Sequence, residues 1–511
     1  MGSAVSGSLY LGLDCSTQSV TALIIDAARR LVVFRDSIPF DAAFPVFGTV
    51  DGVLPPSSPD VVHAPPLMWK TALHAMFERM AASGVDLRQL RAISGSAQQH
   101  GSVYCGEHPH ILTRSTAPIW MDSSTGRECG EIESALGGAQ AVADLTGSRA
   151  YPRFTGPQIR KFAREEPNAY AATARIHLIS SWLASLLIGR HGPVDHADAS
   201  GMNLMDLRTR TWSATALAAT APELAGKLPP LVRSDAVIGA LHESWQTRFD
   251  MPAVPVVAWS GDNPCSLIGT GVLREGQLAV SLGTSDTIFA AMAAPRVSAD
   301  GTGHVFASPT GEYMGITVFR NGALARKRVR DQFALDWDGF SVALRSTDAG
   351  NRGAMTLPWL EPEITPIVPR AMPLSIGLEG AQASGHVRAI VEAQMLALAT
   401  HSAWMGVTPR TIYATGGSAA NRDILQVMAD VFNADVAQSS QTDSAALGAA
   451  IRALQADTGV SWQEAVDGFL PADDAYRLKP VAAHVAVYET ARPAYAALEA
   501  EGLSRLTVAR P

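Results

Sequence analysis

Short apolar runs that end in small polar residues alternate with amphipathic segments along the chain. An apolar run over residues 9–14, a polar turn and a second apolar run over residues 20–26 predict a β-hairpin. The same order recurs at residues 276–282 and 287–289, around the turn Gly283-Thr284-Ser285. Two similar hairpins so far apart in the sequence predict that the chain contains a duplicated unit.

Other stretches have the period of helices or of buried strands. Apolar residues three and four positions apart predict an amphipathic helix over residues 66–80. Residues 421–432 have the same period, and they follow a predicted strand over residues 410–415 and the turn Gly416-Gly417-Ser418. The apolar run over residues 176–188 contains several polar residues and is shorter than the ~20 residues that cross a bilayer. We therefore predict a buried helix there.

An apolar, β-branched run over residues 255–259 ends in two small residues directly before Asp262. Such a run predicts a strand that is buried on both faces. Asn263 as N-cap and Pro264 as first helical residue predict that a helix follows. Asp262 would then lie between strand and helix, where ligands of open α/β sheets bind. We predict that Asp262 is the catalytic base; the alternative is a capping or turn residue.

Two polar clusters suit an anionic or a polyhydroxylated ligand. Asp14 precedes a turn containing Ser16 and Thr17, whose backbone N–H groups could approach a phosphate, and the Asp14 carboxylate suits a hydrated Mg²⁺. Gln99 and His100 follow another predicted strand and supply donors and acceptors for hydroxyl groups. A purely structural role remains the alternative for each cluster.

Aromatic and charged residues are paired in three further places. Asp122 lies close to Trp120, and Arg153 close to Tyr151, a combination that suits the C–H faces and hydroxyl groups of a sugar. Trp337 stands between acidic residues, so we predict that it lies near the surface, where an indole stacks on a flat ligand.

Three further segments are predicted to have structural roles and no part in ligand binding. Residues 195–203 are predicted to form a surface turn, and the basic residues 326–330 a solvated helix face. Residues 443–452 are rich in alanine and glycine, so we predict a helix that packs closely behind the turn at Gly416.

Composition narrows the class of protein. The chain has 511 residues, 47% of them apolar and 17% charged, and domains hold roughly 100–200 residues, so we expect two large domains. A net charge of -8 lacks the basic footprint of a nucleic-acid-binding protein. The four cysteines form no CxxC pair, which fits a reduced compartment. We expect a cytoplasmic protein without nucleic-acid or membrane partners.

Together these motifs resemble the FGGY family of carbohydrate kinases over nearly the whole chain. The resemblance is carried by seven motifs: Gly12-Leu13-Asp14 with its Ser-Thr-Gln turn, Gln98-Gln99-His100-Gly101, Trp120-Met121-Asp122, Arg153-Phe154-Thr155-Gly156, Gly261-Asp262-Asn263-Pro264, Ser281-Leu282-Gly283-Thr284-Ser285 and Ala414-Thr415-Gly416-Gly417.

The resemblance implies an α/β fold with two ribonuclease-H-like (actin-like ATPase) domains that flank a catalytic cleft. Residues 1–255 would form the sugar-binding domain, and residues 256–511 the domain that binds ATP and supplies the base. The implied reaction transfers the γ-phosphoryl group of MgATP to the 5-hydroxyl of D-xylulose. The resemblance also leads us to expect a homodimer.

The resemblance also assigns residues. Asp262 would be the base, and His100, Arg153, Asp262 and Asn263 would contact the sugar, joined by Gln99 and Asp122 from the pattern of residues. Trp337, Gly417, Ser418 and Asn421 would bind ATP, together with the predicted phosphate turns at Ser16, Thr17, Gly283, Thr284, Ser285 and Gly416. Asp14 would be the acid associated with Mg²⁺.

Two alternatives stay open at this point. Many family members place an arginine two residues after the aspartate of the Trp-x-Asp motif, where this chain has Ser124. A kinase for ribulose, glycerol or gluconate is therefore the second candidate. A non-catalytic actin-like nucleotide switch is the third, although Asp262 and the polar residues around His100 argue against it.

Overall fold

The computed structural model describes residues 8–299, 301–439, 443–470 and 477–508, and the chain divides into two compact units. The first unit comprises Met1–Leu273, Val305–Met314 and Asp443–Leu470. The second comprises Arg274–His304, Gly315–Thr442 and Pro471–Pro511.

The first unit is built on a mixed sheet with the strand order β13-β14-β5-β1-β2-β3, and β15 also pairs with β5. The β1–β2 hairpin is antiparallel as predicted, while β5 runs parallel to β1 on one side and to β14 and β15 on the other. Ser96 of β5 lies opposite both Asp14 of β1 and Ser260 of β15. The strands are β1 Leu9–Cys15, β2 Ser19–Asp26, β3 Leu31–Pro39, β5 Leu90–Ala97, β13 Val237–Ala240, β14 Pro255–Val257 and β15 Ser260–Gly261.

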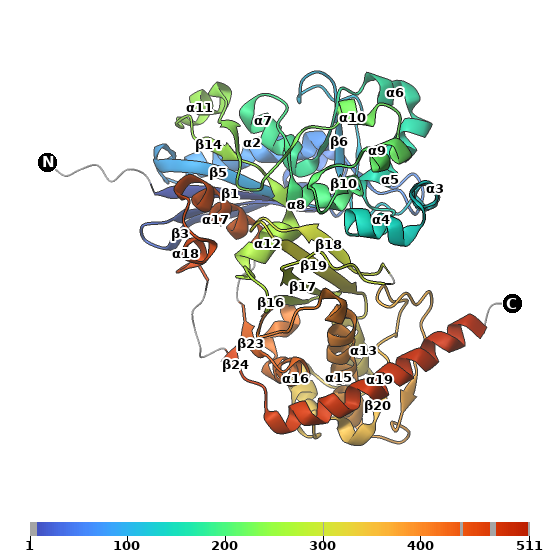
Figure 1. Cartoon of the computed structure of the whole chain (residues 1–511). Coiled ribbons are helices and arrows are strands. Elements are labelled where there is room, and N and C mark those ends of the chain that lie inside the picture. The colour runs from blue at the N-terminus through green and yellow to red at the C-terminus, as the bar shows by residue number, and fades with distance from the viewer. Residues whose placement is uncertain (1–7, 300, 440–442, 471–476, 509–511) are drawn as a thin grey trace. The chain divides into compact units, whose positions relative to one another are not determined.

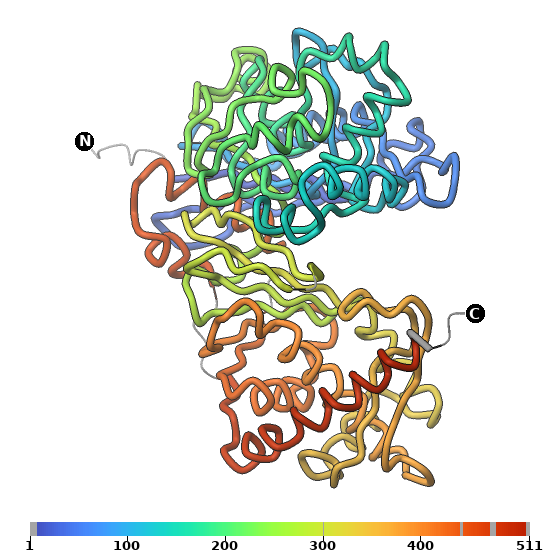
Figure 2. Tube along the Cα trace, turned by 45° about the vertical axis from the view of Figure 1, so that its right-hand side comes forward, coloured from blue at the N-terminus to red at the C-terminus, as the bar shows by residue number. Residues whose placement is uncertain are grey.

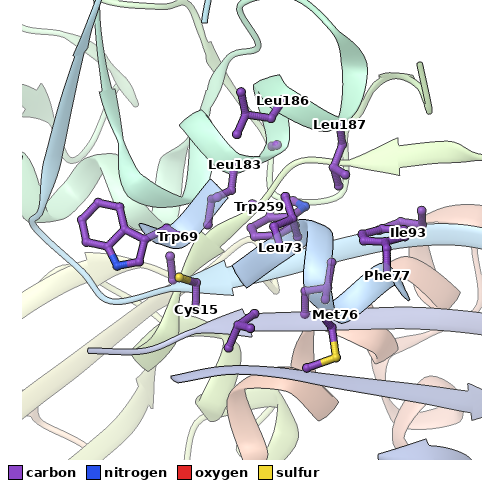
Figure 3. Packing of buried hydrophobic residues seen from close by; sticks show 14 of the residues in the cluster. Cys15, Trp69, Leu73, Met76, Phe77, Ile93, Leu183, Leu186, Leu187 and Trp259 are labelled. Carbon is purple, nitrogen blue, oxygen red and sulfur yellow. The ribbon is translucent and has the colours of Figure 1, made fainter. Parts of the chain in front are cut away.

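Helices cover both faces of this sheet. Helices α2 (Pro66–Ala82) and α7 (Ile179–Ile188) lie on one face, and α17 (Ser444–Thr458) lies on the other (Figure 1). Figure 3 shows the core on the first face, where the predicted apolar stripe of α2 packs with leucines of α7 and with Trp259. Helix α7 is buried along its whole length, which confirms the predicted buried helix over residues 179–188; residues 176–178 of the same apolar run belong to the strand β8 (Arg175–Leu178) instead.

Helix α17 rests directly on the central strand β1. A Cβ atom at Gly12 would lie only 2.1 Å from the carbonyl oxygen of Ala446, so only glycine allows this close approach. The prediction that this helix packs behind the turn at Gly416 is wrong, because its small residues fit against β1 and against α12 (Asp262–Gly269). Figures 1 and 2 both show the orange-red segment beside the blue N-terminal strands.

Smaller elements complete the first unit around the sheet. They include β6 Ser102–Cys105, β8 Arg175–Leu178, α3 Gly126–Leu136, α4 Ala139–Thr146, α5 Thr155–Glu165, α6 Pro167–Ala172, α8 His196–Ala199, α9 Ala214–Thr220 and α11 Glu243–Phe249.

The boundary between the units differs from the predicted division at residue 255. β14, β15 and α12 belong to the first unit, because both strands hydrogen-bond to β5 and α12 packs against α17. Asp262 therefore lies in the first unit instead of the second.

The second unit repeats the hairpin design. Its sheet contains the consecutive strands β17-β16-β22-β23-β24; β16 is antiparallel to β17 and parallel to β22, as β1 is to β2 and β5. The predicted duplication of the hairpin is thus confirmed. The strands are β16 Gln277–Leu282, β17 Asp286–Met292, β22 Thr411–Thr415, β23 Asp435–Gln438 and β24 Arg477–Leu478, and the main helices are α13 Ala323–Gln332, α14 Trp337–Arg345, α15 Ala383–Ser402, α16 Arg422–Phe432 and α19 Ala482–Val508.

None of the helices in the described ranges combines the length and the apolar character that a membrane span requires.

Candidate active site

Asp262 is the first residue of α12, with Gly261 as the N-cap, so the helix starts earlier than predicted. The expectation that Asn263 caps the helix is wrong, because Asn263 is already helical. A Cβ at Gly261 would lie 2.4 Å from Cγ of Gln99, so glycine is needed where strand turns into helix. The Asp262 Oδ1 accepts hydrogen bonds from the backbone N–H of Asn263 at 2.8 Å and from its Nδ2 at 3.1 Å. The carboxylate is thereby fixed through one oxygen.

The surroundings of Asp262 disfavour its charge. Desolvation, followed by the nearby carboxylate of Asp14, raises the pKa of Asp262 to about 7, although hydrogen bonds from the backbone oppose the shift. No ion pair within the described part of the chain reaches Asp262. The side chain nevertheless remains partly accessible to solvent. These are the properties of a carboxylate that can accept a proton near neutral pH.

Asp14 lies near the end of β1, at the same sheet edge. Ser96 Oγ donates a hydrogen bond of 2.6 Å to its Oδ1. Desolvation raises the pKa of Asp14 to about 6, Asp443 adds to the rise, and Ser96 opposes it. A desolvated carboxylate without a cationic partner in the described residues, and with only Oδ1 hydrogen-bonded, has the oxygen-donor chemistry that Mg²⁺ prefers.

His100 is held in a left-handed backbone conformation with φ of 71°. Its Nδ1 donates to the carbonyl oxygen of Gly201 at 2.9 Å, and its ring stacks on Phe154 at 4.3 Å between centroids. Burial, and then the charge of Arg153, lowers the pKa of His100 to about 3. The imidazole is therefore neutral, and its Nε2 is left as an acceptor.

Arg153 follows Tyr151 in a short loop before α5. Its guanidinium lies over the Tyr151 ring, 4.9 Å from the centroid, and the side chain is half-buried. Its electrostatic effect on His100 places the two residues in one neighbourhood. The predicted sugar contacts His100 and Arg153 are thus brought together.

Gln99 and Asn263 connect this neighbourhood to Asp262. The Asn263 Nδ2 donates to Gln99 Oε1 at 2.8 Å and to Asp262 Oδ1 at 3.1 Å. The two amides and the carboxylate form one hydrogen-bonded chain.

Asp122 is placed differently from the prediction of a sugar contact. Its side chain is fully buried, and Oδ2 accepts from the backbone N–H of Val62 at 2.9 Å. Its Oδ1 accepts from Ser124 Oγ at 2.6 Å and from Gln158 Nε2 at 2.7 Å. Asp122 therefore fixes its loop against α5 and does not present an oxygen to a ligand.

Ser124, which follows the Trp-x-Asp motif, has a cationic neighbour. Lys161 of α5 donates from Nζ to Ser124 Oγ at 2.8 Å. A positive charge is thus supplied from a different element.

The turn after β1 is closed by its own residues. The backbone N–H of Ser16 donates to the Ser19 carbonyl at 2.9 Å, and Ser16 Oγ approaches the same oxygen at 3.0 Å. Thr17 Oγ1 accepts from Trp120 Nε1 at 2.8 Å. Trp120 is 42% exposed, so part of its side chain remains accessible next to the turn.

Arg452 of α17 is a residue whose role the sequence did not reveal. It is fully buried, and its guanidinium donates to the carbonyl oxygens of Ser234 and Ala258, each at 2.6 Å, and to Gly95 at 3.4 Å. It thereby fixes the backbone directly before Asp262. No local pattern marks such a contact across nearly 200 residues.

Residues 195–203 are not the surface turn that the sequence predicts. Asp195 and Asp198 are both fully buried, and Asp195 Oδ1 accepts from the backbone N–H of Asp198 at 2.9 Å. Burial beside a second carboxylate raises the pKa of Asp198 well above its ordinary value.

In the second unit, Arg326 lies beneath the predicted phosphate turns and is fully buried. The expectation of a solvated basic face is wrong for this residue. Its guanidinium donates to Asp286 at 2.9 and 3.1 Å, to Gln394 Oε1 at 2.8 Å and to Ser418 Oγ at 3.2 Å. It therefore links the turn Gly283-Thr284-Ser285, which ends at Asp286, to the turn that contains Ser418.

The second turn has the geometry expected of close backbone approach. Gly416 has φ of 87°, and a Cβ there would lie 2.8 Å from the Leu282 carbonyl oxygen, which only glycine avoids. Gly417 begins the 3₁₀ turn Gly417–Ala420. Asn421 caps α16, accepting from the backbone N–H of Asp423 at 3.0 Å, as the start of the predicted helix required.

Trp337 begins α14 and is 44% exposed, as expected near the surface. Arg330 lies over its indole ring, 4.5 Å from the centroid. Asn421 Nδ2 donates to Ser341 Oγ of the same helix at 2.8 Å. The predicted nucleotide residues Trp337, Gly416, Gly417, Ser418 and Asn421 thus belong to one set of connected elements.

Comparison with known proteins defines the class. Residues 9–269 match the N-terminal domain and residues 278–456 the C-terminal domain of the FGGY family of carbohydrate kinases. The chain belongs to this family and is a carbohydrate kinase, with ATP as the phosphoryl donor that the family uses. The resemblance that the sequence motifs indicated is confirmed.

Individual relatives are more specific. The chain is 42% identical to a xylulose kinase of Rattus norvegicus, covering 97% of both chains, and 38% identical to xylulose kinase 2 of Arabidopsis thaliana, covering 87% of both. Among solved structures it resembles a "xyloylose kinase" from Brucella ovis, with 26% identity, a TM-score of 0.83 and coverage of 96% of this chain and 98% of the other.

A xylulose kinase from Rhodospirillum rubrum has 22% identity and a TM-score of 0.86, with coverage of 98% of this chain and 100% of the other. These matches confirm the predicted α/β fold with two actin-like, ribonuclease-H-like domains.

Proposed function

We propose that this carbohydrate kinase transfers the γ-phosphoryl group of ATP to the 5-hydroxyl of D-xylulose, giving D-xylulose 5-phosphate and ADP. The names and the coverage of the relatives support this choice of sugar. The observation that carries the chemistry is Asp262, a partly accessible carboxylate at a helix start whose pKa is raised to about 7.

Asp262 acts as the general base. Its Oδ1 accepts two hydrogen bonds from Asn263, which orient the carboxylate that accepts the proton of the 5-hydroxyl. A base with a pKa near the working pH combines a useful ionised fraction with a sufficient proton affinity. Phosphoryl transfer otherwise depends on positioning and on charge neutralisation, so no covalent enzyme intermediate is required.

The sugar is held by polar groups of the first unit. His100 accepts a hydroxyl hydrogen at Nε2, because its Nδ1 is bound to Gly201. Arg153 donates to hydroxyl oxygens, and Asn263 offers Oδ1 because its two N–H groups are used by Gln99 and Asp262. Gln99 acts through Asn263, and the exposed part of the Trp120 side chain covers sugar C–H groups.

The nucleotide is held by the second unit. The turns Gly283-Thr284-Ser285 and Gly416-Gly417-Ser418 donate backbone N–H groups to phosphate oxygens, Trp337 stacks on the base, and Asn421 contributes a further polar contact. In the first unit Thr17 offers a corresponding backbone donor, whereas the predicted donor of Ser16 is bound to the Ser19 carbonyl. Mg²⁺, with Asp14 as its protein ligand, would neutralise phosphate charge.

A coupled ADP-release assay with a panel of acceptors tests the proposal. D-xylulose should give the highest kcat/KM among D-xylulose, D-ribulose, glycerol and gluconate, and ATP alone should give slow hydrolysis. Higher specificity for another acceptor would replace the sugar but leave the kinase mechanism. Equal ADP release with and without every acceptor would favour the nucleotide switch instead. We also propose a homodimer, which light scattering after gel filtration tests. The expected location of the protein is the cytoplasm.

A further inference from the structure

Asp198 is a buried carboxylate that the mechanism above does not use. It lies in the short helix α8, and Ser180 of α7 donates to its Oδ2 at 2.5 Å. Its Oδ1 is buried without a hydrogen-bond partner of ordinary geometry in the described part of the chain. No ion pair among the described residues compensates it. Burying an acceptor without a hydrogen bond destabilises the folded state unless a donor is close by.

The side-chain amide of Gln99 contains a donor, Nε2, that is also buried and also lacks a partner of ordinary geometry among the described residues. Nε2 lies beside the segment of Asp198, since a Cβ built on Gly201 would be 3.8 Å from it. The Gln99 side chain opposes the rise in the pKa of Asp198, and Asp262 adds to that rise, so the three side chains share one electrostatic environment.

We propose that Asp198 is a positioning residue for the catalytic base: its Oδ1 attracts Gln99 Nε2 and thereby determines which end of the Gln99 amide faces Asn263. With Nε2 turned toward Asp198, Oε1 is turned toward Asn263 and accepts from its Nδ2 at 2.8 Å. The second N–H of Asn263 is then directed to Asp262 Oδ1. Asn263 is left with Oδ1 for the sugar, and the Asp262 carboxylate is held in one orientation for the proton.

The opposite amide orientation would be unproductive. If Gln99 turned Nε2 toward Asn263, two N–H groups would face each other, and Asn263 would turn its own amide to avoid them. Asp262 would lose its side-chain donor, and the sugar would meet an N–H group instead of an acceptor. Asp198 therefore influences both turnover and sugar binding without touching the substrate. This inference rests on the proposed function of Asp262.

A double-variant cycle measures the dependence of Asp198 on Gln99. Asp198→Leu, which removes the acceptor at similar volume, should lower kcat/KM for D-xylulose by roughly 10- to 100-fold, the effect of one buried hydrogen bond left unmade. The KM for ATP should not change. In a Gln99→Leu background the same substitution should cost less than about twofold, because its route to Asn263 is already absent.

Conservative variants separate positioning from simple stability. Asp198→Asn keeps an oxygen for Gln99 and an amide for Ser180, so it should retain most of the activity that Asp198→Leu loses. Asp195→Asn changes the other buried acid of the segment, which does not face Gln99; it should shift the melting temperature and leave the KM for the sugar unchanged. If Asp198→Leu does not fold, Asp198→Ala replaces it in the cycle.

Three results would overturn the inference: additive losses in the cycle, loss of melting temperature with normal kinetics, or equal loss in Asp198→Asn and Asp198→Leu. Asp262→Asn belongs in the same series. Normal turnover in that variant would refute the proposed base, whereas additive losses at Asp198 with an inactive Asp262→Asn would refute only the positioning role.

Discussion

The two duplicated hairpins each hold a desolvated carboxylate at the corner formed by the turn, on the first strand β1 in one unit and on the second strand β17 in the other, and they treat its charge in opposite ways. Asp14 lies where the β1–β2 hairpin meets β5, and Asp286 lies where the β16–β17 hairpin approaches the turn after β22. Asp14 is bound by the hydroxyl of Ser96, whereas Asp286 is bound by both ends of the Arg326 guanidinium.

The electrostatic results follow from this difference. Desolvation raises the pKa of both acids, but at Asp286 the charge and the hydrogen bonds of Arg326 oppose it. At Asp14 only a hydroxyl opposes it, and Asp443 adds to the rise. Asp262 and Asp198 are likewise desolvated beside other carboxylates.

The two units therefore differ in how a buried carboxylate can be used. Buried acids that lack a cation are unstable when ionised, so they favour a proton or a bound cation. A buried acid that is fully paired contributes to a fixed scaffold instead. We therefore expect the reactive carboxylates in the first unit, whereas the second unit has a paired, fully buried support beneath its glycine turns.

Asp262→Asn should give the largest effect on activity. Removing a general base lowers kcat by about 10²–10⁴-fold. The same substitution should increase the stability of the protein, because the pKa of Asp262 in the native state, about 7, exceeds the ordinary value of 3.8. The ionised carboxylate therefore destabilises the native state fully above pH 7, and progressively less as the pH falls from 7 to 3.8.

Calorimetry of the ligand-free protein should show a higher melting temperature for Asp262→Asn at pH 8, and a smaller difference at pH 5. A lower melting temperature at pH 8, or near-normal turnover, would contradict the assignment of an uncompensated base.

Asp286→Asn should cost stability in the second unit. The substitution leaves the Arg326 cation buried without its carboxylate, which costs about 3–5 kcal/mol. The double variant Asp286→Asn, Arg326→Met removes the orphaned charge, so it should recover much of the loss. Denaturant titration of both variants gives the comparison. Equal stability of Asp286→Asn and the unchanged protein would remove the distinction between the two corners.

Local patterns predicted much of this structure. Both hairpins, the helices α2 and α16 and the place of Asp262 between strand and helix follow from hydrophobic period and turn residues. The catalytic candidates His100, Arg153 and Asp262 belong to motifs that are contiguous in sequence, which is why they could be named in advance.

Contacts between distant segments could not be predicted in this way. Arg326 and Arg452 have the local signature of exposed helical arginines, yet both are fully buried by acceptors from remote parts of the chain. Asp198 and Asp122 likewise occur in polar stretches that resemble turns. Their burial depends on which helices pack around them, information that no short window of sequence contains.

The pH dependence of turnover tests the raised pKa of Asp262 in the first unit. Because Asp262 must be ionised to accept a proton, kcat/KM for the sugar should be constant above pH 7 and fall below it, with a limiting slope of tenfold per pH unit. Controls in D₂O and at several buffer concentrations separate proton transfer from buffer effects. A profile that stays flat down to pH 5 would mean that the base has an ordinary carboxylate pKa.

The smallest expected effects are changes in KM: variants of the first unit should change the KM for the sugar, and variants of the second unit the KM for ATP. His100→Ala removes a neutral acceptor for a sugar hydroxyl, so the KM for D-xylulose should rise roughly tenfold while the KM for ATP stays unchanged. Because the pKa of His100 is lowered to about 3, this increase should be the same at pH 6 and at pH 8.

Trp337→Ala removes a stacking surface that Arg330 already shares, so the KM for ATP should rise by several-fold and the KM for the sugar should not change. Steady-state kinetics with each substrate varied in turn measures all four constants. If His100→Ala raised the KM for ATP, or if Trp337→Ala raised the KM for the sugar, the division of sugar and nucleotide between the first and second units would have to be abandoned.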